Sequence, residues 1–307
     1  MKRLGFRPFI EGLDEALEGG VPQGYWVSVF GPPGAYKTLH SLAWCLAGLE
    51  AGERCVYVTT ESTVEQLRQQ LDSLGWSPAR GAVVKALYAS IVDKDGAIRA
   101  RGDADMVIAD VKTLRFLALR LNRVVQSAGK GRKTLWYNDP ELLVYTVLLA
   151  LAEAGVLRPT GRVTPESITA ASLMDAKAGG SRYTPFELEA SATARVVIDS
   201  FAPFIVGRYS VAGRTMTDVK YRLMHDNITV IVANHVSKTR EDELGAEIGH
   251  VVDGRIKLWH DVAGGVLETY GLVAKMRATD HSRVVHRVSL VQAPGGRRLR
   301  WEPLTPQ

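Results

Sequence analysis

Residues 25–38 read YWVSVFGPPGAYKT, and this segment carries the strongest indication of the fold. Its first six residues are mostly aromatic or β-branched, which is typical of a buried strand. The segment GPPGAYKT follows at once, and a mostly apolar stretch at residues 39–49 indicates a helix. Strand, loop and helix in this order form the context in which the pattern G-x-x-x-x-G-K-[ST] binds phosphate groups. The sequence therefore predicts a phosphate-binding loop at residues 31–38.

The loop departs from this pattern at one position, because Tyr36 stands where the second fixed glycine belongs. In such a loop the backbone N–H groups wrap a polyphosphate, Lys37 reaches the β- and γ-phosphates, and Thr38 holds Mg²⁺. The Cβ of Tyr36 predicts weaker or differently posed binding, unless the ring stacks over the site. A proline-glycine turn before a helix is the alternative. The loop residues expected to contact the nucleotide are Gly31, Pro32, Pro33, Gly34, Ala35, Tyr36, Lys37 and Thr38.

Three further β-rich runs each lead into polar residues. The runs are RCVYVT at 54–59 before Glu61, ARVVI at 194–198 before Asp199, and NITVIVA at 227–233 before Asn234 and His235. Short apolar strands that end in polar residues are typical of a buried parallel sheet with its site at the carboxyl ends of the strands. Strand-like runs at 267–276, 283–291 and 298–301 indicate antiparallel strands added at the sheet edge. We therefore expect an α/β fold with a mainly parallel sheet.

The polar strand ends supply candidate catalytic and metal-binding groups. Asp199 stands where a Walker B carboxylate would meet the Mg²⁺ shell, although an aspartate at a strand end also caps turns. Glu61 could orient or deprotonate the attacking water, or it could simply begin the next helix. Asn234 could sense the γ-phosphate through a hydrogen bond, and His235 is a weaker candidate for the same role.

Far more residues separate Glu61 from Asp199 than one crossover helix needs. Helical spacing of leucine and valine at 114–125 and a strongly apolar stretch at 141–156 predict two helices there. We expect a single domain over residues 1–307 with a largely helical insertion at about 89–185. A basic loop, GKGRK at 129–133, and a glycine-rich hinge, AGGS at 178–181, would belong to it.

The composition bounds the class of protein. The chain has 307 residues, of which 46% are hydrophobic and 23% charged, so it is expected to fold around a core. Two cysteines without a Cys-x-x-Cys spacing argue against a disulfide scaffold or a thiolate-metal site. The longest apolar run, 142–152, is too short to span a membrane, which takes about 20 residues. A cytoplasmic setting is the simplest expectation, and a net charge of +5 permits a nucleic-acid partner without favouring one.

Taken together, these pieces resemble a KaiC-like ATPase of the RecA superfamily, a group of P-loop NTPases. The resemblance rests on GLD at 12–14, GGVPQG at 19–24, GPPGAYKT at 31–38, VYVTTES at 56–62, VVIDS at 196–200, VDG at 252–254 and KMRATDHS at 275–282. It covers residues 1 to about 88 and about 186 to 295. It implies ATP and Mg²⁺ as cofactors and a homo-oligomer, often a hexameric ring, with nucleotide at the subunit boundaries.

The resemblance also implies a catalytic role for Lys275 and Arg277. These two residues would face the γ-phosphate of a neighbouring subunit and neutralise charge there. Without the resemblance, an exposed hairpin with solvated basic side chains explains them better. The family commonly has paired glutamates where this chain has Thr60 and Glu61, so one candidate base remains.

These observations support three functional hypotheses. The first is a Mg²⁺-dependent ATPase whose nucleotide state controls assembly or partner binding. The second is a nucleotide-gated scaffold with negligible hydrolysis, which Tyr36 and the missing second glutamate favour. The third, less favoured, is a recombinase-like DNA-binding protein, because basic residues occur along the helix at 112–123 and in the loop at 129–133.

Overall fold

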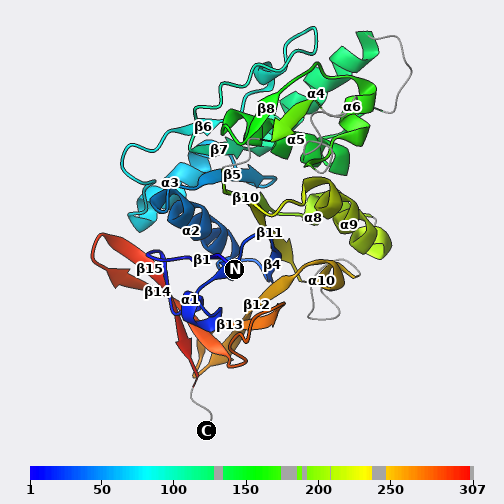
Figure 1. The fold of residues 1–307 in the computed structure, drawn as a ribbon. Helices are drawn as coiled ribbons and strands as arrows, with labels where there is room; N and C mark the ends of the chain where they lie inside the picture. Colours follow the sequence, from blue (N-terminus) through cyan, green and yellow to red (C-terminus); the bar gives the residue numbers. More distant parts are fainter. Residues whose placement is uncertain (128–133, 174–184, 189–191, 208, 237–246, 305–307) are drawn as a thin grey trace.

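The computed structural model describes residues 1–127, 134–173, 185–188, 192–207, 209–236 and 247–304. These residues contain one large sheet (Figure 1). Within these residues, eleven strands pair in the order β2-β15-β14-β13-β12-β4-β11-β10-β5-β7-β6. The parallel part contains β12 (Gly254–Ala263), β4 (Trp26–Gly31), β11 (Ile228–His235), β10 (Ala194–Asp199), β5 (Arg54–Thr59), β7 (Met106–Ala109) and β6 (Val84–Ala86).

The carboxyl-terminal strands extend this sheet in the antiparallel sense. They are β13 (Val266–Met276), β14 (His286–Ala293) and β15 (Gly296–Pro303), and β2 (Ile10–Glu11) lies beside β15 at the edge. Two small sheets accompany it, β1 (Arg3–Leu4) with β3 (Val21–Pro22), and β8 (Leu157–Pro159) with β9 (Phe186–Leu188). The predicted α/β class, with a mainly parallel sheet and antiparallel strands at the carboxyl-terminal end, is confirmed.

Helices cover the sheet (Figure 1). The alternation of strand side chains divides the core of the described residues into two clusters. In β5, Cys55 and Tyr57 belong to one core cluster, and Val56 and Val58 belong to the other. The first cluster packs α1 (Leu13–Ala16), α2 (Lys37–Glu50) and α3 (Val64–Leu74). The second packs α4 (Val111–Ser127), α5 (Pro140–Glu153), α6 (Pro165–Ala170), α8 (Ala202–Ile205), α9 (Ala212–Leu223) and α10 (Ile248–Val251). Two 3₁₀ turns, η1 (Ala89–Ile91) and η2 (Tyr209–Val211), complete the described elements.

Helix α5 accounts for the longest apolar run of the sequence. Every residue from 142 to 152 is buried, because α5 lies within the second core cluster and is covered by its neighbours. None of the helices in the described residues is both long and apolar enough to cross a membrane.

The segment predicted as an insertion contains a strand of the main sheet. Strand β7 is buried and pairs in parallel with β5, from Cys55 opposite Met106 to Val58 opposite Ala109. It spans only four residues, and β6 spans three, so neither run is long enough to stand out in the sequence. The two predicted helices correspond to α4 and α5. The basic loop at 129–133 and the hinge at 178–181 lie outside the described residues, and the division of the chain into core and insertion stays a prediction.

Candidate functional site

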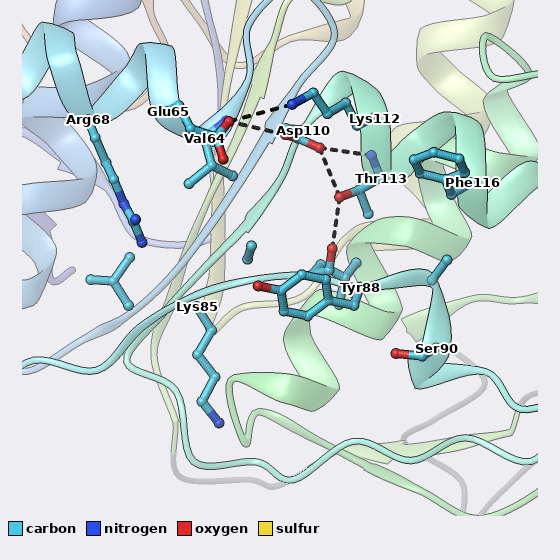
Figure 2. Close-up of a pocket in the computed structure, with 14 residues that line it drawn as sticks. Val64, Glu65, Arg68, Lys85, Tyr88, Ser90, Asp110, Lys112, Thr113 and Phe116 are labelled. Carbon is cyan, nitrogen blue, oxygen red and sulfur yellow. Dashed lines mark hydrogen bonds and ion pairs between the residues drawn. The ribbon is translucent and has the colours of Figure 1, made fainter.

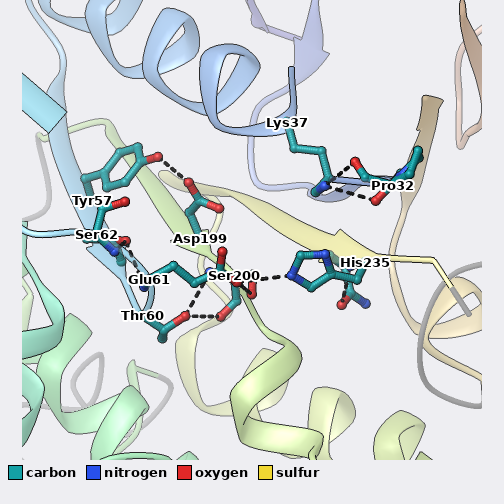
Figure 3. Close-up of polar contacts among 12 residues, drawn as sticks. Pro32, Lys37, Tyr57, Thr60, Glu61, Ser62, Asp199, Ser200 and His235 are labelled. Carbon is teal, nitrogen blue, oxygen red and sulfur yellow. Dashed lines mark hydrogen bonds and ion pairs between the residues drawn. The ribbon is translucent and has the colours of Figure 1, made fainter. Parts of the chain in front are cut away.

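The predicted phosphate loop connects β4 to α2. Gly31 ends β4 beside β12, and a Cβ at this position would lie 2.6 Å from the Leu258 carbonyl oxygen, so only glycine fits. Lys37 begins α2, and its Nζ donates hydrogen bonds to the carbonyl oxygens of Gly31 at 2.9 Å and Pro32 at 2.8 Å (Figure 3). The lysine therefore folds back over the loop. Burial lowers the pKa of Lys37, and the carboxylates of Asp199 and Glu61 oppose that shift.

Tyr36 adopts a backbone conformation that favours glycine. Its φ of 62° and ψ of 17° lie in the left-handed region, immediately before α2 begins. Gly34, two positions earlier, also has a positive φ of 83°. A residue with a Cβ adopts this conformation at a cost of about 1–2 kcal/mol. The residue before α2 is thus left-handed although it is not glycine.

Asp199 lies at the carboxyl end of β10, between β5 and β11. Its Oδ2 accepts a hydrogen bond from the Tyr57 hydroxyl at 2.6 Å, and the Thr38 hydroxyl is a further donor to the carboxylate. Burial raises the pKa of Asp199, and these two donors oppose the shift. The Thr38 hydroxyl of the loop and the Asp199 carboxylate of β10 therefore lie close together. Both are oxygen ligands of the kind that Mg²⁺ prefers.

Glu61 joins the ends of three neighbouring strands. Its Oε1 accepts hydrogen bonds from the Ser200 hydroxyl at 2.7 Å and from His235 Nε2 at 3.1 Å (Figure 3). The Nε2 atom carries a hydrogen in this arrangement, because an ionised carboxylate can only accept. The His235 hydrogen bond is the largest of the effects that lower the pKa of Glu61 to about 2. Glu61 is therefore ionised, half exposed and held in place.

Thr60 reinforces this junction between β5 and β10. The Ser200 backbone N–H donates to the Thr60 hydroxyl at 3.1 Å, and that hydroxyl donates to the Ser200 carbonyl at 3.1 Å. The Thr60 backbone N–H also donates to the Asp199 carbonyl at 2.9 Å. These bonds fix the two strand ends relative to each other, and with them the two carboxylates.

A cavity of about 400 Å³ lies where the loop and the strand ends meet. The loop contributes Lys37 and Thr38 to its wall, and the strand ends contribute Glu61, Asp199 and His235. One lysine faces two carboxylates here, so the cavity suits a polyanion that arrives with a divalent cation. Asn234, in contrast, is fully buried and does not line the cavity; its Oδ1 accepts from the His235 backbone N–H at 3.0 Å.

Lys275 and Arg277 do not line this cavity. Lys275 of β13 lies opposite Arg255 of β12, and Arg255 lies opposite Ser28 of β4. Ser28 precedes Gly31 by three residues, which is about 10 Å along β4. Lys275 Nζ donates to the carbonyls of Gly249 at 3.0 Å and Val252 at 2.6 Å. Burial is the main cause that lowers the pKa of Lys275.

Arg277 lies beside α10, the helix that contains Gly249. Its guanidinium donates to Asp253 Oδ1 at 3.0 Å, while more than half of the side chain stays exposed. The structure therefore does not bring Lys275 and Arg277 together with Lys37, Glu61 or Asp199 within the chain.

Three residues of the site were not predicted as members of it. Tyr57 holds Asp199, the Ser200 hydroxyl holds Glu61, and His260 Nε2 donates to the Pro33 carbonyl at 3.2 Å. Ser200 follows Asp199 directly and could have been proposed from its position. The Tyr57 contact depends on the register between β5 and β10, and His260 lies in β12, for which no strand was predicted from the sequence.

A second cavity, of about 560 Å³, lies between α3, α4 and β6 (Figure 2). Asp110 carries the polar contacts at its wall, and it accepts from the backbone N–H groups of Val64 at 3.2 Å and Thr113 at 2.8 Å. The Thr113 hydroxyl also donates to Asp110 at 2.9 Å, and Lys112 pairs with Glu65 at 3.8 Å. This carboxylate joins the starts of two helices, so we assign it a structural role.

The parallel sheet, the loop before α2 and the carboxylates at the strand ends define a RecA-like P-loop protein. A family model described as "ATPase: KaiC" matches residues 6–130 and 186–294, and the chain belongs to this family. The match includes β6, β7 and α4, and it leaves residues 131–185 unmatched. Membership of the family indicates nucleotide binding.

Similar proteins agree with this assignment. A UPF0273 protein from Methanopyrus kandleri is 28% identical over 277 residues, which cover 90% of this chain and 85% of that protein. The circadian clock protein KaiC2 of Synechocystis is 31% identical over 125 residues, 40% of this chain and 21% of that protein. The crystal structure of a KaiC-like protein from Pyrococcus horikoshii has a TM-score of 0.53 and 21% identity and covers 97% of both chains, which supports the fold.

Proposed function

We propose that this protein is a Mg²⁺-dependent ATPase whose nucleotide state controls its assembly or its binding to partners. The observation that carries the proposal is the cavity of about 400 Å³ into which Lys37, Thr38, Asp199 and Glu61 converge. Its position at the carboxyl ends of parallel strands is where α/β proteins bind nucleotides. Membership of the KaiC ATPase family supports ATP as the ligand.

The donor set at this cavity fits ATP with Mg²⁺. The Thr38 hydroxyl and the Asp199 carboxylate would hold the ion, which would neutralise charge on the transferring phosphoryl group. Among the described residues, the hydrogen-bond partners of Lys37 Nζ are carbonyls of the loop, and the lysine would exchange them for phosphate oxygens. The backbone N–H groups at the start of α2 would add to the phosphate cradle.

Glu61 is the residue we expect to act on the attacking water. Its carboxylate is ionised and held by Ser200 and His235, so its other oxygen can accept a hydrogen bond from water. A pKa of about 2 makes it a weak general base at neutral pH. We therefore assign it to orienting the water rather than to abstracting a proton in full.

Lys275 and Arg277 are proposed to act in trans, in a homo-oligomer for which a hexameric ring is favoured. The register of β12 and β13 separates them from their own phosphate loop. Arg277 is more than half exposed and carries its charge at the surface. An arginine supplied across a subunit boundary would couple hydrolysis to assembly.

A nucleotide-gated scaffold with negligible hydrolysis is the second candidate function. The observation in its favour is the low pKa of Glu61, because a carboxylate that strongly prefers its ionised form takes up a proton poorly. Under this alternative the protein binds ATP through the same loop, and binding alone would drive assembly.

ATP binding itself is tested by isothermal calorimetry with Mg²⁺ present. Lys37→Ala is expected to weaken ATP binding at least tenfold, because it removes the cation that faces the phosphates. Lys94→Ala, at an exposed lysine outside the cavity, is the matched control and should bind as the wild type does. Equal ATP affinity in the wild type and Lys37→Ala would show that the loop is not the nucleotide site.

A further inference from the structure

A chain of buried hydrogen bonds runs from the last strand of the sheet to the phosphate loop. The Trp301 indole N–H donates to His40 Nε2 at 2.9 Å. His40 Nδ1, on the opposite side of the same ring, lies 2.8 Å from the carbonyl oxygen of Tyr36. His40 is fully buried and Trp301 is 2% exposed, so no solvent competes for these bonds. Strand β15 thereby contacts the residue that replaces the loop glycine.

The partners of His40 fix its tautomer. An indole N–H can only donate, so Nε2 must be the acceptor and the ring hydrogen resides on Nδ1. The Tyr36 carbonyl can only accept, which agrees with a donor at Nδ1. Because Nε2 accepts a hydrogen bond, it carries no proton, and the ring is neutral in this arrangement. His40 is therefore a neutral donor aimed at the loop.

The Tyr36 carbonyl receives two hydrogen bonds, and His40 supplies both. The backbone N–H of His40 donates at 3.0 Å, and the ring Nδ1–H donates at 2.8 Å. The peptide group is planar and trans, so the N–H of Lys37 points away from the oxygen that precedes it. Holding the Tyr36 oxygen therefore also sets the direction of the Lys37 N–H, which belongs to the phosphate cradle at the start of α2.

Tyr36 needs such support more than a glycine would. Its left-handed conformation is unfavourable for a residue with a Cβ, whereas glycine adopts it freely. We propose that His40, oriented by Trp301, is a positioning residue that keeps Tyr36 in the left-handed conformation and so lets a tyrosine stand in the phosphate loop. This inference rests on the proposed function of the loop as a nucleotide site.

Trp301 is itself held by the carboxyl-terminal strands. It pairs with Val288 across β14 and β15, and a Cβ at Gly271 of β13 would lie 2.5 Å from its ring. The indole thus occupies space that only glycine leaves open, in the middle of three strands. Through Trp301 and His40, these strands determine the geometry of a loop that lies far away in the sequence.

The test is a double-mutant cycle between His40 and Tyr36 in the full-length chain, read out as ATP affinity by calorimetry with Mg²⁺. His40→Leu should weaken ATP binding about tenfold when residue 36 is tyrosine, the scale of the left-handed cost. In the Tyr36→Gly background the same substitution should change the affinity less than about twofold, because glycine needs no support. Trp301→Phe keeps a ring but loses the donor, and it should show the same dependence on residue 36.

Two controls separate this role from a purely structural one. His40→Gln retains a donor and an acceptor, so it should recover part of the affinity that His40→Leu loses. The second control is the Tyr36→Gly background itself. Equal losses of affinity with tyrosine and with glycine at position 36, or no loss in either, would overturn the proposal and leave His40 as a core residue.

A second measurement does not depend on ATP. The φ of Tyr36 can be followed in the ligand-free protein by its NMR amide coupling constant, and we expect it to leave the left-handed range in His40→Leu. An unchanged φ in that variant would also overturn the proposal. Failure of the wild type to bind ATP would instead contradict the proposed function, and the φ measurement would still decide the role of His40.

Discussion

At the scale of single residues, the direction of a side chain decides which candidates reach the site. Asn234 and His235 end the same strand, and successive side chains point to opposite faces, so only one of them can line the cavity. The structure gives that position to His235, which binds Glu61. The sequence favours Asn234 instead, and its place behind the cavity follows from this alternation. Asn234 can still act by fixing the backbone of His235.

The contact between His235 and Glu61 predicts a measurable shift in acidity. The hydrogen bond from His235 is the largest cause of the low Glu61 pKa of about 2, so His235→Ala should raise the Glu61 pKa toward its ordinary value of 4.5. NMR titration of the labelled glutamate carboxyl would measure this. Because the folded pKa lies below the unfolded one, Glu61 stabilises the fold above pH 4.5 and loses that contribution as the pH falls toward 2.

Tyr57→Phe is a control for this titration, because Tyr57 binds Asp199 and not Glu61. The Glu61 pKa should stay near 2 in that variant. A Glu61 pKa that is the same in His235→Ala as in the wild type would contradict the assigned hydrogen bond.

At the scale of elements, a buried ion pair connects β10 to the segment after α2. Arg195 Nε donates to Glu53 Oε2 at 2.6 Å, and both side chains are at most 5% exposed. Arg195 also donates to the carbonyls of Gly5 at 2.7 Å and Trp44 at 2.8 Å. The pair therefore ties the amino-terminal segment, α2 and β10 together at the amino ends of the parallel strands.

Removing one partner of this pair should destabilise the protein strongly. Glu53→Gln leaves the Arg195 charge buried without its counter-ion, and we expect a loss of about 3 kcal/mol in the free energy of unfolding. Glu50→Gln, at the exposed end of α2, should change it by less than about 0.5 kcal/mol. Urea unfolding measures both, and a Glu53→Gln variant as stable as Glu50→Gln would show that the pair contributes little.

The elements that can be predicted from the sequence are the ones with strong local signals. YWVSVF, RCVYVT, ARVVI and NITVIVA are long and rich in β-branched residues, and all four form strands of the parallel sheet. β7 was missed because four residues give no period to detect. The Tyr57 contact with Asp199 was missed for a different reason, since it joins neighbouring strands across the sheet and depends on their register.

The His40 and Trp301 contact could not be predicted from spacing either. The two residues lie in α2 and β15, at opposite ends of the sequence, and no local pattern connects them. Tyr36 was visible as a departure from the loop pattern. The contacts that we propose hold Tyr36 in its conformation depend on the packing of the carboxyl-terminal strands against α2, and the sequence does not show this packing.

At the scale of the whole molecule, the position of Lys275 and Arg277 predicts complementation between defective subunits. Lys37→Ala lacks a working phosphate loop, and Arg277→Ala lacks the proposed trans arginine, so each alone should have little ATPase activity. A mixed assembly would contain boundaries with an intact loop on one side and Arg277 on the other. Mixing the two variants should therefore recover part of the steady-state phosphate release.

Hetero-assembly must be checked in the same sample, for example by pull-down of differently tagged subunits. Mixed assemblies that remain as inactive as their parents would show that Arg277 does not act across the boundary. The surface-hairpin interpretation of KMRATDHS would then hold.

Steady-state phosphate release from ATP by the wild type and Glu61→Gln tests the proposed ATPase activity. We predict Mg²⁺-dependent release by the wild type, and a lower turnover in Glu61→Gln with unchanged ATP affinity, because the neutral amide lacks the negative charge with which Glu61 orients the water and does not contact the phosphates. Lys37→Ala sets the background. Wild-type release that does not exceed this background, in protein that binds ATP, would contradict the ATPase and leave the nucleotide-gated scaffold.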